Sequence, residues 1–223
     1  MSALGVPNFD NVLRIDRTRK VCLVVFDGLG WEALWANQEL APFLASQLPS
    51  GRTLTAGFPS TTATSVASIG MGQPPGEHGL LGFTMALPGQ AHAMNVLRWT
   101  AYGTSKPADL TTKLPPEQLQ PQPTALETAS KAGVDVTLTG PAVHEQSGLS
   151  RAALRGGRFV AAVSAGDLVA NCLAALQAGE RSFIYAHHND MDTAGHARGV
   201  NSDAWRFQLR QTDRLCQTLV EHL

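Results

Sequence analysis

The sequence has little charge and no clear excess of either sign. Only 16% of its 223 residues are charged, and 17 Lys and Arg stand against 18 Asp and Glu, which leaves a formal net charge of −1. A chain without a basic surplus lacks the long-range attraction that draws proteins to nucleic-acid polymers or to anionic membrane surfaces. We therefore expect neither kind of partner.

Long apolar runs and paired cysteines are also missing. No apolar run approaches the ~20 residues that span a bilayer, and the first residues lack the basic and apolar regions of a signal peptide. Cys22, Cys172 and Cys216 are odd in number and widely spaced, which is typical of free thiols in a reducing compartment. These absences predict a cytoplasmic protein.

Apolar residues are abundant, at 43% of the chain, which is enough for a folded domain with a substantial core. Apolar, β-branched runs predict strands at residues 20–26, 53–56, 91–99, 134–138, 158–163 and 182–187. Helical periodicity and start signals predict helices at 31–37, 42–48, 62–69, 124–132, 165–177 and 202–223. Turns are expected at 70–82 and a loop at 104–122.

This alternation predicts an α/β fold, with a mostly parallel central sheet flanked by helices. We expect one domain over residues 1–223, in which residues 84–180 include an insertion that shapes the substrate pocket.

Ligands of open α/β sheets bind beyond the carboxyl ends of the strands, so residues that directly follow apolar runs are the first candidates. Asp27-Gly28 follows the strand expected at 20–26, where a carboxylate can bind a metal ion. The same Asp could instead cap the helix expected at 31–37, and this motif alone leaves both interpretations open. A haloacid-dehalogenase-type phosphatase is disfavoured because it needs a second Asp where this chain has Leu29.

Hydroxyl residues crowd the start of the helix expected at 62–69. Five of the six residues from Ser60 to Ser65 carry a hydroxyl group, and helix capping accounts for only one of them. The free N–H groups and positive end of a helix suit a phosphate. A Thr at this place can attack phosphorus if a metal ion lowers its pKa.

A third segment, from Tyr185 to His196, follows the strand expected at 182–187. Asp192 and His196 are four positions apart, so a helical turn would place both at one divalent ion such as zinc. The alternative is a polar loop with incidental histidines. His187 and His188 are interpreted as structural residues rather than ligands.

Taken together and in this order, the three segments resemble the type I phosphodiesterase/nucleotide pyrophosphatase family of the alkaline phosphatase superfamily. The matching residues are Asp27-Gly28, the stretch FPSTTATSVASIGMGQPPGEHG at 58–79, and Asp192-Thr-Ala-Gly-His196. The stretch ends in the family's Gly-x-x-Pro-x-x-His-Gly turn, and the family spacing makes Thr62 the nucleophile, with Thr61 in reserve. His78 belongs to the turn and is not a ligand in the family.

The resemblance implies a centre of two divalent metal ions, usually zinc. Asp27 and Thr62 would bind one ion, and Asp192 and His196 the other, so these four residues are expected to converge. The implied reaction is hydrolysis of phosphodiester or nucleotide pyrophosphate bonds in a small phosphorylated substrate, through a phospho-threonine intermediate.

The sequence departs from the family in two places. No Asn follows the turn in the segment 80–84, and nothing after His196 supplies the Asp-His pair and further His that complete the family's metal site. We therefore expect this chain to be the N-terminal part of a longer protein and a poor catalyst by itself. A sulfatase is disfavoured, because no cysteine begins a C-x-P-x-R run. A phosphomonoesterase or phosphomutase, or an inactive domain that binds a phospho-ligand, stays open.

Overall fold

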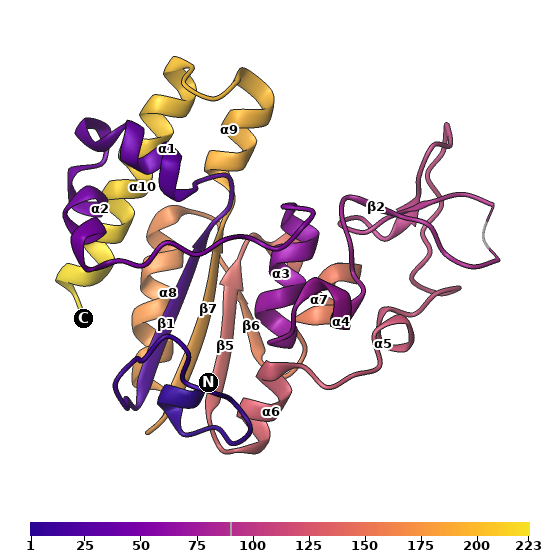
Figure 1. The fold of residues 1–223 in the computed structure, drawn as a ribbon, viewed down its shortest axis with the longest axis horizontal. Coiled ribbons are helices and arrows are strands. Elements are labelled where there is room, and N and C mark those ends of the chain that lie inside the picture. Colours follow the sequence, from indigo (N-terminus) through magenta and orange to yellow (C-terminus); the bar gives the residue numbers. More distant parts are fainter. Residues whose placement is uncertain (90) are drawn as a thin grey trace. The chain divides into compact units, whose positions relative to one another are not determined.

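The computed structural model describes residues 1–89 and 91–223, so Gln90, within the expected insertion, lies outside the described residues. The chain forms two compact units, each made of three segments of the sequence. The colours of Figure 1 follow the sequence and identify these segments. The first unit comprises Met1–Arg19, Thr55–Val136 and Val143–Arg158. The second comprises Lys20–Leu54, Thr137–Ala142 and Phe159–Leu223.

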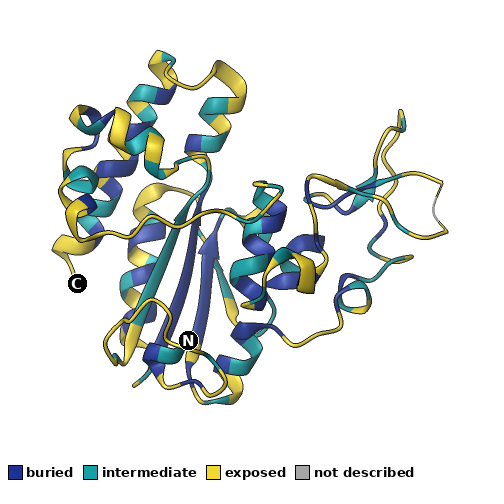
Figure 2. Cartoon of the chain, viewed as in Figure 1, coloured by how far each residue is buried: buried dark blue, intermediate teal, exposed yellow. Residues whose placement is uncertain are grey.

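The second unit is built on a four-stranded sheet with the order β1-β7-β5-β6. The strands are β1 (Lys20–Phe26), β7 (Ser182–His188), β5 (Asp135–Gly140) and β6 (Arg158–Ala161). β1 and β7 are parallel, with Lys20 opposite Ser182 and Phe26 opposite His188. β7 is buried along its whole length, as Figure 2 shows, which fits an interior strand of a parallel sheet. The expected α/β fold with a parallel central sheet is confirmed.

Two long helices cover this sheet and build the main core of the second unit. Helix α8 (Ala165–Gln177) packs against β7 and β1, and α10 (Asp203–Glu221) packs against α8 (Figure 1). Their apolar sides meet Ile184 and Ala186 of β7 in one buried cluster. Each helix begins at a Ser whose hydroxyl accepts a hydrogen bond from the third residue of the helix, which satisfies a free N–H group.

A smaller cluster surrounds Trp205, which is fully buried near the start of α10. It includes residues of α1 (Trp31–Ala36), α2 (Pro42–Gln47) and α9 (Asp190–Arg198). The buried carboxylate of Asp213 accepts hydrogen bonds from the N–H groups of Phe43 and Leu44, at 3.3 and 2.7 Å. Asp213 thereby satisfies free donors at the start of α2 and fixes that helix to α10.

The first unit is mainly helical. Its helices are α3 (Thr62–Met71), α4 (Pro75–His78), α5 (Pro116–Leu119), α6 (Ala125–Lys131) and α7 (Gly148–Ala153). Helix α3 packs against α4, α6 and α7. A small antiparallel sheet has the order β2-β3-β4, formed by Thr84–Met85, Met94–Asn95 and Thr100–Ala101. Short 3₁₀ helices occur along the chain at Ser2–Leu4, Gln38–Leu40, Leu48–Ser50 and Ala142–His144.

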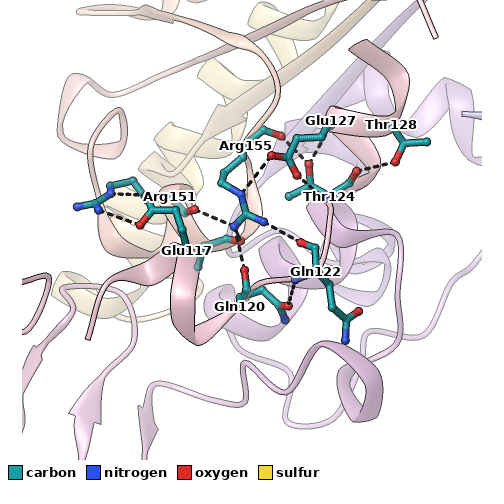
Figure 3. Close-up of polar contacts among 9 residues, drawn as sticks. Glu117, Gln120, Gln122, Thr124, Glu127, Thr128, Arg151 and Arg155 are labelled. Carbon is teal, nitrogen blue, oxygen red and sulfur yellow. Dashed lines mark hydrogen bonds and ion pairs between the residues drawn. The ribbon is translucent and has the colours of Figure 1, made fainter. Parts of the chain in front are cut away.

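Arg155 connects the segment around α5 to α6 and α7, as Figure 3 shows. Its guanidinium donates to four backbone carbonyls, those of Gln120, Gln122, Arg151 and Ala152. It also lies 3.4 Å from the carboxylate of Glu127. Glu127 in turn forms a capping box with Thr124 at the start of α6. One side chain therefore satisfies carbonyls that have no partner in a helix or strand.

Most of the expected elements occur within one to three residues of their predicted bounds, and α8 matches its prediction at both ends. The strand expected at 53–56 is wrong, because those residues are exposed and form neither helix nor strand. The strand expected at 91–99 shrinks to β3, since the chain turns at Trp99, which has a φ of 55°. Among the described residues, no helix is both long and apolar enough to cross a membrane.

We predict that Arg155→Lys lowers the free energy of unfolding by about 1–3 kcal/mol, because Lys cannot donate to several carbonyls in a fixed fork. Urea denaturation measures this loss. Arg210→Lys is the matched control, since Arg210 is exposed on α10, and it should change stability by less than about 0.5 kcal/mol. Equal effects of the two substitutions would contradict the role of Arg155.

Candidate active site

The candidate active site of the second unit begins where β1 ends. The N–H of Asp27 donates to the carbonyl of His188 at 2.9 Å, which extends the pairing of β1 with β7 by one residue. The carbonyl of Asp27 accepts from the N–H of Asp192, in the first turn of α9, at 3.1 Å. These bonds join the strand end to the helix start, so two predicted site residues that are far apart in the sequence lie side by side.

Gly28 permits this close approach. Its φ of +77° lies in the left-handed region, and a Cβ atom at this position would lie 2.5 Å from the Cα and 2.6 Å from the N of Asp192. Those are backbone atoms, which cannot move aside as the end of a flexible side chain can. Only glycine fits here without displacing α9.

The carboxylates of Asp27 and Asp192 influence each other electrostatically. Burial raises the pKa of Asp192 above its usual value, and the negative charge of Asp27 raises it further, while His196 and His187 oppose the shift. Like charges held together are unfavourable in the absence of a counter-charge. A divalent cation would supply that counter-charge and lower the pKa of Asp192 again.

His187 and Tyr185 lie behind Asp27. The Nε2 atom of His187 is 3.6 Å from Oδ2 of Asp27, and the hydroxyl of Tyr185 is 3.0 Å from Nδ1 of His187. Burial raises the pKa of Tyr185, and the charge of Asp27 raises it further, so the phenol stays protonated. The phenol can therefore donate to Nδ1, which leaves the Nε2–H of His187 to face the carboxylate of Asp27.

His187, which the sequence analysis interpreted as a structural residue rather than a ligand, thus contacts one of the predicted ligands. Side chains alternate between the two faces of β7, so Tyr185 and His187, two positions apart, point to the same face. This alternation could have indicated from the sequence that the two side chains lie together. In the parallel register, His187 lies opposite Val25, two residues before Asp27.

His196 follows Asp192 by one turn of α9, and its Nε2 lies 3.4 Å from Oδ1 of Asp192. The helical turn proposed between these residues is present. The side chain of His196 is 83% exposed and that of Asp192 is 32% exposed, so both are accessible to solvent. Within residues 1–89 and 91–223, no group of three or more His, Cys, Asp or Glu side chains is arranged to hold a metal ion.

Thr61 and Thr62 stand at the start of α3, in the first unit. Thr61 is the N-cap residue, and its Oγ1 accepts from the N–H of Thr64 at 3.4 Å. The Oγ1 of Thr64 accepts from the N–H of Gly82 at 2.9 Å. Thr62 is the first residue of the helix and is half-buried. Its expected convergence with Asp27, Asp192 and His196 stays a prediction.

His78 organises the Gly-rich turn of the first unit. Its Nδ1 accepts from the N–H of Leu80 at 3.1 Å, so the ring hydrogen lies on Nε2, which is 2.9 Å from the hydroxyl of Ser68. The carbonyl of His78 accepts from the side-chain amide of Gln120. Both ring nitrogens therefore have partners, one in α3 and one directly after the turn.

We predict that Gly28→Ala destabilises the protein by at least about 2 kcal/mol, from the left-handed φ and the overlap with α9. The matched control is Gly30→Ala, because Gly30 has a φ of −104° and no atom within 4 Å of a built Cβ. Urea denaturation should separate the two variants. Hydrogen exchange of the Asp192 amide should also become faster in Gly28→Ala, and unchanged exchange would contradict the close approach.

We predict that the free energy of unfolding falls at acidic pH because His78 becomes protonated. Burial lowers the pKa of His78 below its usual value of 6.5, so the unfolded chain binds more protons than the folded chain just below that pH. Stability should therefore fall as the pH drops below about 6.5, by less than about 1.4 kcal/mol per pH unit. His78→Gln should flatten this slope between pH 5 and about 6.5, whereas His92→Gln, at an exposed position, should leave it unchanged.

Comparison with known proteins identifies the family of the chain. Residues 21–223 match the sequence model of the family described as type I phosphodiesterase / nucleotide pyrophosphatase. No curated protein sequence matches the chain.

Solved structures resemble the chain in fold. An inactive form of murine ectonucleotide pyrophosphatase / phosphodiesterase 5 in complex with AMP has a TM-score of 0.67 at 16% identity, over 92% of this chain and 52% of that one. The human protein of the same name has a TM-score of 0.66 at 17% identity, over 91% and 51% of the two chains. Phosphonoacetate hydrolase from Sinorhizobium meliloti 1021, in complex with phosphonoacetate, has a TM-score of 0.56 at 19% identity, over 91% and 53%.

The chain spans about half the length of these structures. At such low identity they establish the fold, whereas the family model covers nearly the whole sequence and includes Asp27, Thr62, Asp192 and His196. This chain belongs to the type I phosphodiesterase/nucleotide pyrophosphatase family.

Proposed function

We propose that this chain carries the nucleophile and part of the metal site of an enzyme that hydrolyses phosphodiester or nucleotide pyrophosphate bonds. The observation that supports this most is the junction of β1 with α9, where two carboxylates that repel each other are held together by a backbone hydrogen bond. Polar groups arranged at such a cost are more typical of functional sites than of structural ones. Family membership directs the proposal to phosphoester chemistry.

The donor atoms fit divalent cations in kind, because carboxylate oxygen and imidazole nitrogen together suit zinc. We assign Asp27 and Thr62 to one ion and Asp192 and His196 to a second. Bound ions would neutralise phosphoryl oxygens and lower the pKa of the attacking hydroxyl. Catalytic zinc sites have about three protein ligands for each ion, whereas this assignment gives two. We therefore expect this chain alone to bind the ions weakly.

The chain's own residues have distinct roles in the proposed reaction. The Thr62 hydroxyl loses its proton to solvent, its Oγ1 attacks phosphorus, and the bond from phosphorus to the leaving oxygen breaks. The leaving oxygen takes up a proton from water, and a second water molecule then hydrolyses the phospho-threonine. N–H groups at the start of α3 can hold phosphoryl oxygens while Thr61 caps the helix. His187, with Tyr185 behind it, positions the carboxylate of Asp27.

A small phosphorylated molecule is our proposed substrate. The murine neighbour was solved with AMP and the bacterial one with phosphonoacetate, and both ligands carry one phosphorus group on a small organic part. A second candidate is binding of such a molecule without turnover. The lack of any group of three metal-binding side chains among the described residues favours this alternative for the chain by itself.

We predict that Thr62→Ala lowers turnover of a nitrophenyl phosphodiester by orders of magnitude in the natural polypeptide that contains this chain, because the attacking oxygen is removed. Thr61→Ala is the matched control. It removes the cap of α3 and should cost about 1 kcal/mol of stability with a far milder loss of turnover. A reversed order would make Thr61 the nucleophile.

The same variants separate catalysis from metal binding. Zinc affinity, measured by calorimetry, should change little in Thr62→Ala, since only one weak ligand is lost. Asp192→Asn should weaken zinc binding strongly, because it removes a charged ligand. If Asp192→Asn binds zinc as tightly as the unaltered protein, the proposed metal site is wrong, whatever the order of the two Thr variants.

A further inference from the structure

A pocket of about 190 Å³ lies within the second unit, at the carboxyl ends of β5, β6 and β7. This is the sheet edge at which open α/β folds bind ligands. Its volume is smaller than the ~300 Å³ of the smallest drug-sized sites. The pocket therefore suits a ligand, or part of one, with few non-hydrogen atoms.

His188 lines this pocket and has one polar atom without a partner among the described residues. Its side chain lines the pocket and is only 9% exposed, with Nε2 3.5 Å from Oδ2 of Asp190. The Nδ1 atom is buried and has no hydrogen-bond partner in the part of the chain that the structure describes. Because Nε2 faces a carboxylate, the ring hydrogen belongs there, and Nδ1 is left as an acceptor. Buried polar atoms nearly always have partners, so a ligand atom is expected at Nδ1.

Donors come from the helix that starts at the pocket. Ser164 and Ala165, at the start of α8, both line it. The hydroxyl of Ser164 accepts a hydrogen bond from the N–H of Asp167, and the carbonyl of Ser164 accepts one from the N–H of Leu168. The N–H groups of Ala165 and Gly166 are among those that an α-helix leaves without a partner inside the helix. This 13-residue helix therefore directs free donors to the place where His188 offers an acceptor.

The start of α9 adds an amide. Asn189 lines the pocket and precedes α9, and its side chain makes no cap hydrogen bond to that helix. Its amide can donate and accept.

The charges around the pocket determine the class of ligand. No Lys or Arg lines it, and Asp190 does, so a fully charged anion would meet a carboxylate and no cation. Close donors and acceptors of both kinds match hydroxyl groups, each of which donates one hydrogen bond and accepts two. The apolar wall that includes Ala162 and Leu168 can contact the carbon atoms of the same molecule.

We infer that this pocket binds a small neutral polyhydroxylated molecule, of the size of glycerol or a pentose sugar. Hydroxyl groups of the ligand donate to Nδ1 of His188 and to the carboxylate of Asp190, and they accept from the start of α8. None of the proposed metal ligands Asp27, Asp192 and His196 lines the pocket, whereas His187, which contacts Asp27, lies between the pocket and that site. Binding does not depend on the proposed hydrolysis.

The test is a titration of the ¹⁵N-labelled full chain with D-ribose, followed by NMR. We expect saturable shifts of the Ala165, Gly166 and Asn189 amides, with a millimolar dissociation constant, and a shift of the His188 Nδ1 resonance. His188→Phe keeps the ring and should weaken binding about tenfold, the value of one hydrogen bond. Inorganic phosphate should cause no saturable shift.

Asp190→Asn provides a second variant if His188→Phe fails to fold. It should weaken ribose binding severalfold, because the amide keeps one acceptor and loses the charge. Asp203→Asn is the matched control, since Asp203 has the equivalent first-turn position in α10, and it should leave affinity unchanged. The proposal is overturned if phosphate binds as tightly as ribose. It is equally overturned if ribose causes no saturable shift, or if the pocket variants bind it as the control does.

Discussion

One backbone contact determines the geometry of the candidate active site. The N–H of Asp192 reaches the carbonyl of Asp27 only because Gly28 has no side chain. Parallel pairing brings the ends of β1 and β7 to the same level, and α9 begins two residues after β7. Because the connection between β7 and α9 is so short, the first turn of α9 lies close to the end of β1. The positions of Asp192 and of His196, one turn later, follow from this contact.

The contact has an electrostatic cost that the fold only partly offsets. The negative charge of Asp27 raises the pKa of Asp192, whereas His196 and His187 oppose that shift. Two like charges held together do not favour folding. This cost is why Asp27 and Asp192 are proposed as ligands of a cation, and it is argued independently of the family match.

Local signals explain which parts of the fold were predictable from the sequence. β1, β7 and α8 are marked by continuous apolar runs or by a Ser cap, and their bounds were found closely. The two-residue strands of the small sheet are too short to show periodicity, and they depend on pairing across loops and on the turn at Trp99. The place of Asp27 directly after a strand was readable from the sequence, and its role as a ligand stays a prediction. The contact of His187 with Asp27 was not readable, since it depends on the register of β1 with β7.

The last two residues of β7 show how one strand end can serve two sites. Successive side chains of a strand point to opposite faces, and each of these histidines faces a different carboxylate, His187 that of Asp27 and His188 that of Asp190. A buried strand tolerates two adjacent imidazoles only if their nitrogens find partners. Tyr185 satisfies Nδ1 of His187, whereas nothing among the described residues satisfies Nδ1 of His188. The described residues thus complete the hydrogen bonding of Nδ1 in His187, whereas Nδ1 of His188 keeps the acceptor that we assign to the proposed ligand.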